Sequence, residues 1–223
     1  GEEDRAACHE LADRMAAGAD STDWHEWADD RSPLVCQPVR WARELRPEWI
    51  ALEEVPAVLG LWEHMARIFR AWGYSVWVGT LLAADYGVPQ TRTRAILMAS
   101  RVRTVTPPEP THAEHPEGVD MFGGGQREKW VSMADALGWP AGDTVRPSRG
   151  QGMIERYGER PDHPAGGPAP TIIGKSRSWE RISERPPTIE GVTGEGQFRP
   201  DGIRITPQEA GVLQSFPADY PWG

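Results

Sequence analysis

Acidic and basic side chains lie at the ends of two apolar segments near the middle of the chain. Glu53 and Glu54 directly follow one short apolar run. Gln90, Arg92 and Arg94 alternate just before another. An acid at the end of a buried strand is partly desolvated, so its pKa rises and it can hold or donate a proton near neutral pH. If the two strand ends meet at one sheet edge, a carboxylate and a guanidinium could together bind and polarise a planar polar ligand.

Each of these groups also has a purely structural interpretation. Pro56 is typical of a helix start, so the Glu53–Glu54 pair could cap the helix that follows. Three polar side chains at alternate positions point to one side of an extended chain, and they could form a solvated sheet edge. The secondary-structure elements around these residues help to distinguish the chemical interpretation from the structural one.

The order of predicted elements indicates an α/β fold. Residues 49–52 are continuously apolar, which predicts a central strand in a covered parallel sheet. Apolar residues at helical spacing over 57–72 predict a helix that ends at Gly73. Residues 74–81 and 95–99 predict two further strands.

Two helices are predicted upstream of these elements. The first covers residues 6–17 and stops at Gly18. Ser32, followed by a proline, predicts the N-cap of the second. Pro38 lies inside the second helical pattern and should bend it, and Pro47 should stop it.

Downstream of residue 105 the chain becomes rich in proline, glycine and arginine. Residues 140–200 show little periodicity, which predicts either a disordered segment or a loop-built binding surface held by a few strands. One short helix is expected within 130–139, capped by Ser132 and ended by Gly138. Two segments in it, 168–174 and 185–191, resemble each other. Regular structure returns at 206–209, where Thr-Pro-Gln-Glu predicts a helical capping box.

Composition restricts the classes of function. The net charge of −9 comes largely from residues 1–30, whereas 91–104 carry four arginines and no acid, so a nucleic-acid partner is not excluded. No apolar run is long enough to span a membrane. Cys8 and Cys36 are too few for a disulfide framework or a zinc site, which predicts a reduced, cytoplasmic protein. The non-Met start and the abrupt end predict a piece of a longer chain.

Taken together, the motifs resemble those of the DNA cytosine-5 methyltransferases. In that family a Glu-Asn-Val motif ends a strand and a Gln-x-Arg-x-Arg motif follows, as Glu53-Glu54-Val55 and Gln90-Thr-Arg92-Thr-Arg94 do here. The segment 205–217 is similar to the family's late helix, Leu-Thr-x-x-Glu-Ala-x-x-Leu-Gln-x-Phe-Pro. Either of the two Pro-x-x-Thr segments could be the motif that precedes this helix.

The resemblance implies a partial Rossmann-like, S-adenosylmethionine-dependent methyltransferase that methylates C5 of a flipped cytosine in double-stranded DNA. Glu53 would contact N3 of the cytosine and hold its proton during attack at C6, and Arg94 would bind the O2 side. Gln90, Arg92 and Glu54 would be substrate-binding, with Gln90 and Arg92 bracing that edge. A monomer is expected, with a restriction endonuclease as a candidate partner.

The resemblance also predicts how the chain is divided. Residues 1–105 would be a partial catalytic domain, 106–200 the target-recognition region, and 201–223 a return to the catalytic domain. The tryptophans are expected to be mostly core, with base stacking as an alternative for two of them. Those assigned to apolar faces are Trp41, Trp49, Trp62, Trp72 and Trp77, and the two with an alternative are Trp130 and Trp179.

This sequence departs from the family at functionally important places. Glu54 replaces the usual Asn, and there is no Pro-Cys nucleophile motif, no Phe-x-Gly-x-Gly cofactor loop and no closing Gly-Asn segment. The chain alone is therefore expected to be inactive. Two alternatives stay open: a non-catalytic DNA-binding or partner subunit of a split enzyme, and an unrelated α/β enzyme with Cys36 as nucleophile. We predict instead that Cys36 and Cys8 are buried structural cysteines.

Overall fold

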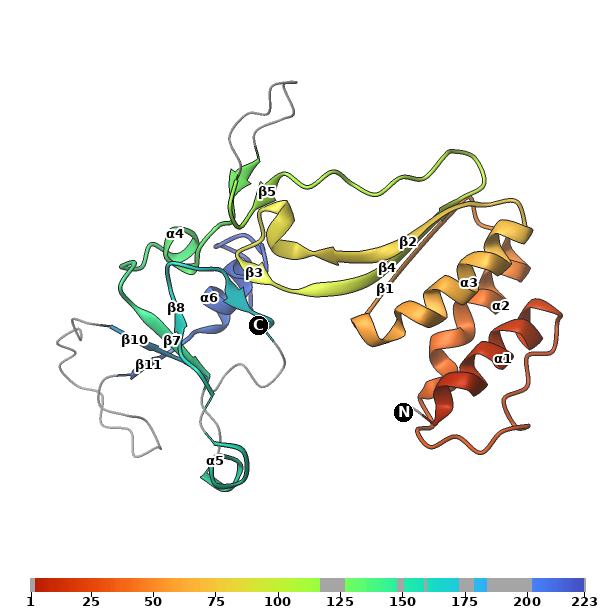
Figure 1. Ribbon diagram of the computed structural model, residues 1–223, viewed down its shortest axis with the longest axis horizontal. Helices are drawn as coiled ribbons and strands as arrows, with labels where there is room; N and C mark the ends of the chain where they lie inside the picture. Colours follow the sequence, from red (N-terminus) through yellow and green to blue (C-terminus); the bar gives the residue numbers. More distant parts are fainter. Residues whose placement is uncertain are drawn as a thin grey trace. The chain divides into compact units, whose positions relative to one another are not determined.

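The protein divides into two compact units, which Figure 1 shows as ribbons. Unit 1 consists of Gly1–Leu81 and Thr93–Glu109, and unit 2 of Leu82–Arg92 and Pro110–Gly223. The computed structural model describes residues 3–116, 127–147, 151–158, 160–172, 179–183 and 202–222.

Unit 1 is a mixed α/β unit whose helices precede and separate its strands. Its elements are α1 (Asp4–Ala16), the 3-10 helix η1 (Ser32–Cys36), α2 (Gln37–Leu45), β1 (Trp49–Glu54), the 3-10 helix η2 (Pro56–Val58), α3 (Leu59–Ala71), β2 (Ser75–Leu82) and β4 (Thr93–Ser100). The predicted first helix, the helix over 57–72 and the strands near 74–81 and 95–99 are thus confirmed. Gly73 adopts a positive φ of 87° just after α3, as expected for a helix end.

The arrangement of the strands corrects one prediction. The sheet order is β1-β4-β2, so β1 lies at the end of this order, not at its centre. It pairs antiparallel with β4, from Trp49 opposite Ser100 to Glu54 opposite Ala95. The apolar run was interpreted as buried on both faces, but its side chains alternate between partly buried and exposed. An antiparallel strand needs only one buried face. Because Trp49, which was predicted to be core, and Ala51 on the exposed face are also apolar, the sequence of β1 does not show the alternation of buried and exposed positions.

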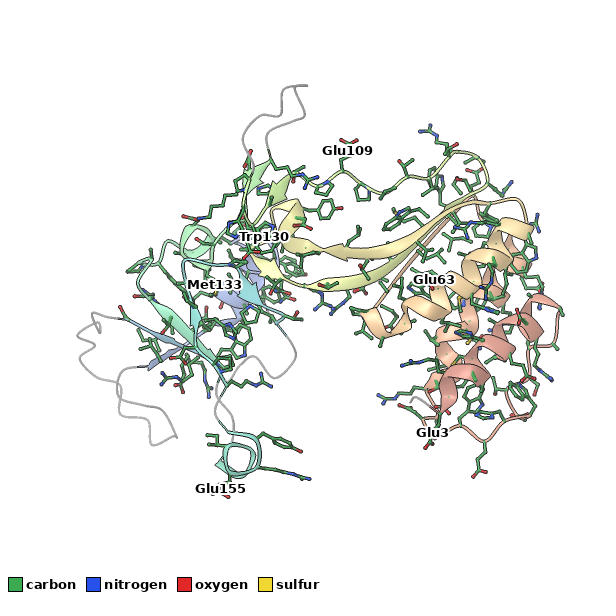
Figure 2. All side chains as sticks on the ribbon, viewed as in Figure 1. Glu3, Glu63, Glu109, Trp130, Met133 and Glu155 are labelled. Carbon is green, nitrogen blue, oxygen red and sulfur yellow. The ribbon has the colours of Figure 1, made fainter. Side chains whose placement is uncertain are left out.

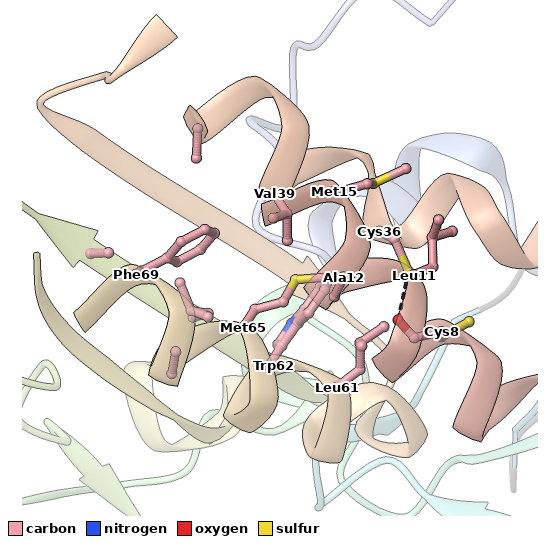
Figure 3. Packing of buried hydrophobic residues seen from close by; sticks show 14 of the residues in the cluster. Cys8, Leu11, Ala12, Met15, Cys36, Val39, Leu61, Trp62, Met65 and Phe69 are labelled. Carbon is pink, nitrogen blue, oxygen red and sulfur yellow. Dashed lines mark hydrogen bonds between the residues drawn. The ribbon is translucent and has the colours of Figure 1, made fainter. Parts of the chain in front are cut away.

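The helices of unit 1 lie on one side of this sheet (Figure 1): α3 packs against β4, and α1 packs on α2 and α3. Figure 3 shows their shared core, in which Phe69, Met65 and Leu11 are completely buried. From the sheet, Leu97 and its neighbours at alternate positions on β4 complete this core. Trp62 also anchors α3 to the sheet, because its indole N–H donates to the carbonyl of Ala95 at 3.3 Å. Burial of these apolar surfaces, at about 25 cal/mol per Å² removed from water, is the main stabilising term in unit 1.

The second predicted helix begins differently from expectation. Residues 32–36 form the 3-10 helix η1, and Pro38 stands in the first turn of the separate helix α2 instead of bending a longer one. Proline is tolerated in the first turn, where its missing N–H has no helical partner to lose. Ser32 does not cap the helix; its hydroxyl donates to Asp4 at 2.6 Å. Arg46 ends α2 in the left-handed conformation. Trp41 of α2, predicted to be core, is 53 % exposed.

Asp4 holds the loop between α1 and η1 in place. It is buried, and its carboxylate accepts hydrogen bonds from the N–H groups of Ala28 (2.9 Å) and Asp29 (3.1 Å) and from the hydroxyl of Ser32. The hydrogen bond from Ser32 and those from the two backbone groups hold the pKa of Asp4 well below its usual range. The ring nitrogen Nε2 of His25 also lies 3.7 Å from the Asp4 carboxylate, so this acid contacts several parts of the loop.

We expect acid to destabilise the native chain more steeply than an Asp4→Asn variant. The folded-state pKa of Asp4 is lowered, so its contribution is complete above the ordinary Asp pKa of about 4 and is lost as the pH falls toward the folded-state value. Thermal melting followed by circular dichroism from about pH 7 down to about pH 3 measures this. Parallel curves for the two proteins would contradict it, and Asp30→Asn is a control because it removes an exposed acid from the same loop.

Unit 2 is built from short strands and helices. Its elements are η3 (Ala83–Tyr86), β3 (Gln90–Thr91), β5 (His112–Ala113), β6 (Glu128–Lys129), α4 (Met133–Leu137), β7 (Thr144–Pro147), α5 (Gln151–Tyr157), β8 (His163–Pro164), β9 (Ala169–Pro170), β10 (Trp179–Ile182), β11 (Gly202–Arg204) and α6 (Pro207–Val212). A sheet in the order β11-β10-β7-β8 forms its centre. A region held together by a few short strands is therefore confirmed for the described part.

The predicted caps of unit 2 are also confirmed. Ser132 caps α4 through a hydrogen bond from the N–H of Asp135, and Gly138 ends that helix with a φ of 66°. In Figure 2, Met133 marks the start of this helix in unit 2. Thr206 and Glu209 form the full capping box of α6. Of the two similar segments, 168–174 contributes β9, whereas 185–191 lies outside the described residues.

Candidate functional site

Glu53 and Arg94 form the candidate site of unit 1. The antiparallel register places Glu53 opposite Ile96, so Arg94, two residues earlier on β4, is on the same face of the sheet. The guanidinium Nε of Arg94 lies 2.7 Å from Oε1 of Glu53. A further nitrogen of Arg94 donates to the carbonyl of Thr93 at 2.7 Å, which fixes the orientation of the guanidinium plane. The structure thus brings together the two residues to which the sequence assigned chemistry.

The pair is accessible from solvent. The Glu53 side chain is 54 % exposed and that of Arg94 is 17 % exposed. The acid is therefore less buried than the strand-end prediction assumed, because it points away from the face that the helices cover. An accessible carboxylate beside a guanidinium offers hydrogen-bond acceptors and donors side by side, which suits a ligand with both kinds of group on one planar edge.

Glu54 has a different environment from its neighbour. It is opposite Ala95 and so belongs to the helix-covered face, and its Oε2 accepts the N–H of Val55 at 2.9 Å. This bond steadies the chain where β1 turns into η2. The structure thus separates the two adjacent acids: Glu53 faces the accessible side, and Glu54 accepts the N–H of its neighbour Val55. The 3-10 helix η2 has no side-chain cap, so the capping role considered from the sequence is wrong for this helix.

Replacing Glu54 by Gln should leave the fold and the site intact, because a side-chain oxygen can still accept the Val55 N–H. Glu54→Leu removes the acceptor and should cost about 0.5–1.5 kcal/mol, the net range for one hydrogen bond. Urea unfolding of the two variants measures the difference. Equal stability of Gln and Leu variants would show that this hydrogen bond contributes nothing.

Gln90 and Arg92 do not share one strand with Arg94. Gln90 belongs to β3, which pairs in parallel with β9, and the strand is interrupted at Arg92 before β4 begins. The prediction of three side chains on one solvated side is therefore wrong. Gln90 is completely buried, and its amide nitrogen lies 3.4 Å from the carbonyl of Leu213, just after α6. This placement of Gln90 fits a bracing role within unit 2. In the same unit the carbonyl of Arg92 accepts a hydrogen bond from the N–H of Ala83 at 2.9 Å.

Both cysteines are buried, as predicted. The thiol of Cys36 donates to the carbonyl of Cys8 at 3.3 Å, shown by the dashed line in Figure 3. The contact with Cys8 and burial raise the pKa of the Cys36 thiol far above its ordinary value. The thiolate is the nucleophilic form of cysteine, so this environment suppresses nucleophilic reactivity. The geometry therefore gives no support to an unrelated enzyme that uses Cys36.

Two cavities of unit 1 lack the features of an S-adenosylmethionine site. They have volumes of about 390 and 450 Å³ and lie against α1, but neither is lined by Glu53 or Arg94. Neither is formed by a glycine-rich loop, which a strand-to-helix cofactor site would need, and the sequence contains no Phe-x-Gly-x-Gly. Among the described residues there is also no cluster of three metal-ligating side chains, and no helix long and apolar enough to cross a membrane.

Comparison with known proteins identifies the family. The profile of the C-5 cytosine-specific DNA methylases matches residues 21–223, so the chain belongs to this family. The family uses S-adenosylmethionine and has a DNA substrate, which implies a methyltransferase fold for the mixed α/β unit. A Rossmann-like strand arrangement is not evident in the described sheets.

Several curated relatives are type II methyltransferases. The chain is 28% identical to the type II methyltransferase M1.HphI of Haemophilus parahaemolyticus over 205 residues, covering 87% of this chain and 54% of the relative. It is 40% identical to M.XorII of Xanthomonas oryzae pv. oryzae over 93 residues, 37% of this chain and 22% of the relative. It is 28% identical to rat DNA (cytosine-5)-methyltransferase 1 over 161 residues, 69% of this chain and 10% of that protein. The chain thus spans about half the length of M1.HphI and less of the other two.

Proposed function

We propose that this chain is the base-holding and DNA-reading part of a DNA cytosine-5 methyltransferase, which transfers a methyl group from S-adenosylmethionine to C5 of a flipped-out cytosine. The observation that carries the proposal is the contact between Glu53 and Arg94 on an accessible strand end, in a chain of this family. The Pro-Cys nucleophile and the cofactor loop are not in this sequence, so the chain alone should not catalyse the reaction.

The two side chains have complementary tasks in this proposal. Cytosine becomes a better electrophile at C6 when N3 is protonated or receives a hydrogen bond. Glu53, in its protonated form, donates to N3, and its other oxygen accepts from the exocyclic amine. The Arg94 guanidinium donates to O2 and stabilises the negative charge that builds up on the ring during attack. The ion pair between them opens to admit the base.

Arg92 and Gln90 then act by bracing, not by contact with the base. Gln90 is fully buried next to Leu213 and so is a positioning residue for the strand that precedes Arg94. We also propose that residues 106–200 are the target-recognition region, that 1–105 are catalytic, and that 201–223 return to the catalytic domain. Loops held by short strands suit DNA reading because they can present side chains to the groove and the backbone.

A methylation assay tests the function. The chain is expressed together with the polypeptide encoded directly upstream of Gly1, and methyl transfer from labelled S-adenosylmethionine to double-stranded DNA is measured. We expect transfer to cytosine C5 by the pair of polypeptides, and none by this chain alone. Transfer to a different atom, or to protein instead of DNA, would contradict the proposal.

A second function is favoured by the lack of a Pro-Cys dipeptide. The chain could be the natural partner subunit of a split methyltransferase, in which another polypeptide carries the thiolate. A start codon immediately before Gly1 and a separate reading frame with the Pro-Cys motif would distinguish this from a single longer enzyme. In the split enzyme, Glu53 and Arg94 would keep their roles.

A further inference from the structure

The two cysteines of unit 1 lie at one contact, between α1 and η1. The thiol of Cys36 donates to the carbonyl of Cys8 at 3.3 Å, and the thiol of Cys8 donates to the carbonyl of Ser32 at 3.6 Å. Each sulfur therefore lies against the backbone of the segment that carries the other sulfur. Figure 3 shows both side chains at this contact, beside Leu11. Both thiols are free in the structure.

The fold holds this contact in place from both sides. Cys8 lies one turn after Asp4 and therefore on the same face of α1. Asp4 accepts the hydroxyl of Ser32 at 2.6 Å, so Ser32 is bound to α1 through its side chain as well as through its carbonyl. Cys36 is completely buried in the core that α1 shares with the other helices. The two sulfurs are thus kept close together as long as unit 1 is folded.

The two thiols differ in their access to small molecules. Cys8 lines the cavity of about 450 Å³, together with apolar side chains that include Val35 and Leu61, whereas Cys36 does not line it. A water molecule takes up about 30 Å³ of the liquid, and hydrogen peroxide is only slightly larger. The cavity therefore admits a small oxidant to Cys8 but is too small for a second copy of the chain.

The contact between the thiols also makes them unequal in reactivity. The hydrogen bond from Cys36 lowers the pKa of Cys8, and it outweighs burial and the Asp4 carboxylate, which raise that pKa. Thiolate is the form of cysteine that peroxide oxidises. The largest cause of the raised pKa of Cys36 is its contact with Cys8. Once Cys8 is oxidised and uncharged, this cause disappears, and Cys36 can lose its proton in turn.

We propose that Cys8 and Cys36 are a peroxide-oxidised pair, which forms an intramolecular disulfide between α1 and η1. The Cys8 sulfur attacks one oxygen of hydrogen peroxide, the O–O bond breaks, and the departing hydroxide takes up a proton as water, leaving Cys8 as a sulfenic acid. The Cys36 sulfur then loses its proton and attacks the Cys8 sulfur. The S–S bond forms, the S–O bond breaks, and the hydroxide leaves with that proton as a second water. Two thiols are oxidised and one peroxide is reduced, independently of the proposed function.

Mass spectrometry of the complete 223-residue chain, before and after treatment with hydrogen peroxide, tests this oxidation. We expect the intact mass to fall by two hydrogen atoms and trypsin to release residues 6–14 linked to residues 32–40. Dithiothreitol should restore both thiols, as it does for a disulfide but not for a sulfinic acid. Two unlinked peptides that still carry free thiols, or a disulfide-linked dimer, would overturn the proposal.

Two variants test the order of the steps. Cys36→Ala should stop at the sulfenic acid of Cys8, which dimedone traps, whereas Cys8→Ala should leave Cys36 modified at least about 10-fold more slowly, because no cavity reaches it. Alanine keeps both positions small and apolar, and circular dichroism checks that each variant folds. Equal modification of the two variants would contradict the assigned order, and the result on the native chain does not depend on either variant. Because neither DNA nor S-adenosylmethionine takes part, failure of the catalytic proposal would leave these measurements unaffected.

Discussion

Glu53→Gln should lower kcat/KM for DNA methylation by about 10²- to 10⁴-fold in the enzyme assembled from this chain and its upstream part. Gln retains the size of the side chain but cannot supply a proton to N3 of the base. The reaction is followed as methyl transfer from labelled S-adenosylmethionine to double-stranded DNA. Most of the loss should appear in kcat, because the proton matters chiefly when C6 is attacked.

Arg94→Ala should cause a comparable loss, about 10²- to 10³-fold, since it removes a charged donor from the developing oxyanion. The double variant Glu53→Gln/Arg94→Ala should lose less than the product of the single effects, because the two groups contact each other at 2.7 Å and act on one ring. Glu54→Gln is the matched control at the neighbouring acid and should remain near the native rate. Full activity of both Glu53→Gln and Arg94→Ala would refute the assigned roles.

Asp143→Leu should cost about 3–5 kcal/mol and unfold unit 2 selectively, because it breaks a buried ion pair and leaves a cation without its partner. Asp143 is 1 % exposed, accepts from Nε of Arg181 at 2.5 Å and from the hydroxyl of Ser183 at 3.0 Å. The Arg181 guanidinium also lies 4.8 Å from the ring centre of Trp139. Asp143 therefore joins the start of β7 to β10 and to the core of unit 2.

Hydrogen exchange resolved along the sequence measures this effect, since it reports the two units separately. Protection should be lost in β7 and β10 and retained in α1, α3 and β4. Asp162→Ala is the control: its pair with Arg146 is more exposed, and its loss should cost less than about 1 kcal/mol. Loss of protection throughout both units would show instead that they unfold together.

Local signals in the sequence predicted local structure well. The capping box at Thr206 and Glu209, the serine cap of α4 and the helical period of α3 each depend on residues within a few positions of one another. The contact between Glu53 and Arg94 was also predicted, and the two residues lie within strands β1 and β4, which pair with each other in the sheet. The order and spacing of the two motifs were sufficient to predict this contact.

Contacts that depend on strand pairing could not be predicted in the same way. The prediction that β1 belongs to a parallel sheet was wrong, because a short apolar run has the same sequence pattern in a parallel and in an antiparallel sheet. Gln90 is buried and donates to the carbonyl of Leu213, which is 123 residues away, and no local pattern in the sequence indicates this contact. The Asp143–Arg181 pair, 38 residues apart, gave no signal either, since a buried acid and a surface acid look the same in one sequence.

The short stretch Leu82–Arg92 belongs to unit 2, although strands of unit 1 flank it on both sides. Its β3 pairs with β9, and its Gln90 reaches the end of α6. An engineer who exchanges only the later, loop-rich half between relatives would therefore separate these partners. Chimeras that carry the donor's own 82–92 stretch along with that half should express and melt cooperatively, whereas those that keep the host's stretch should not.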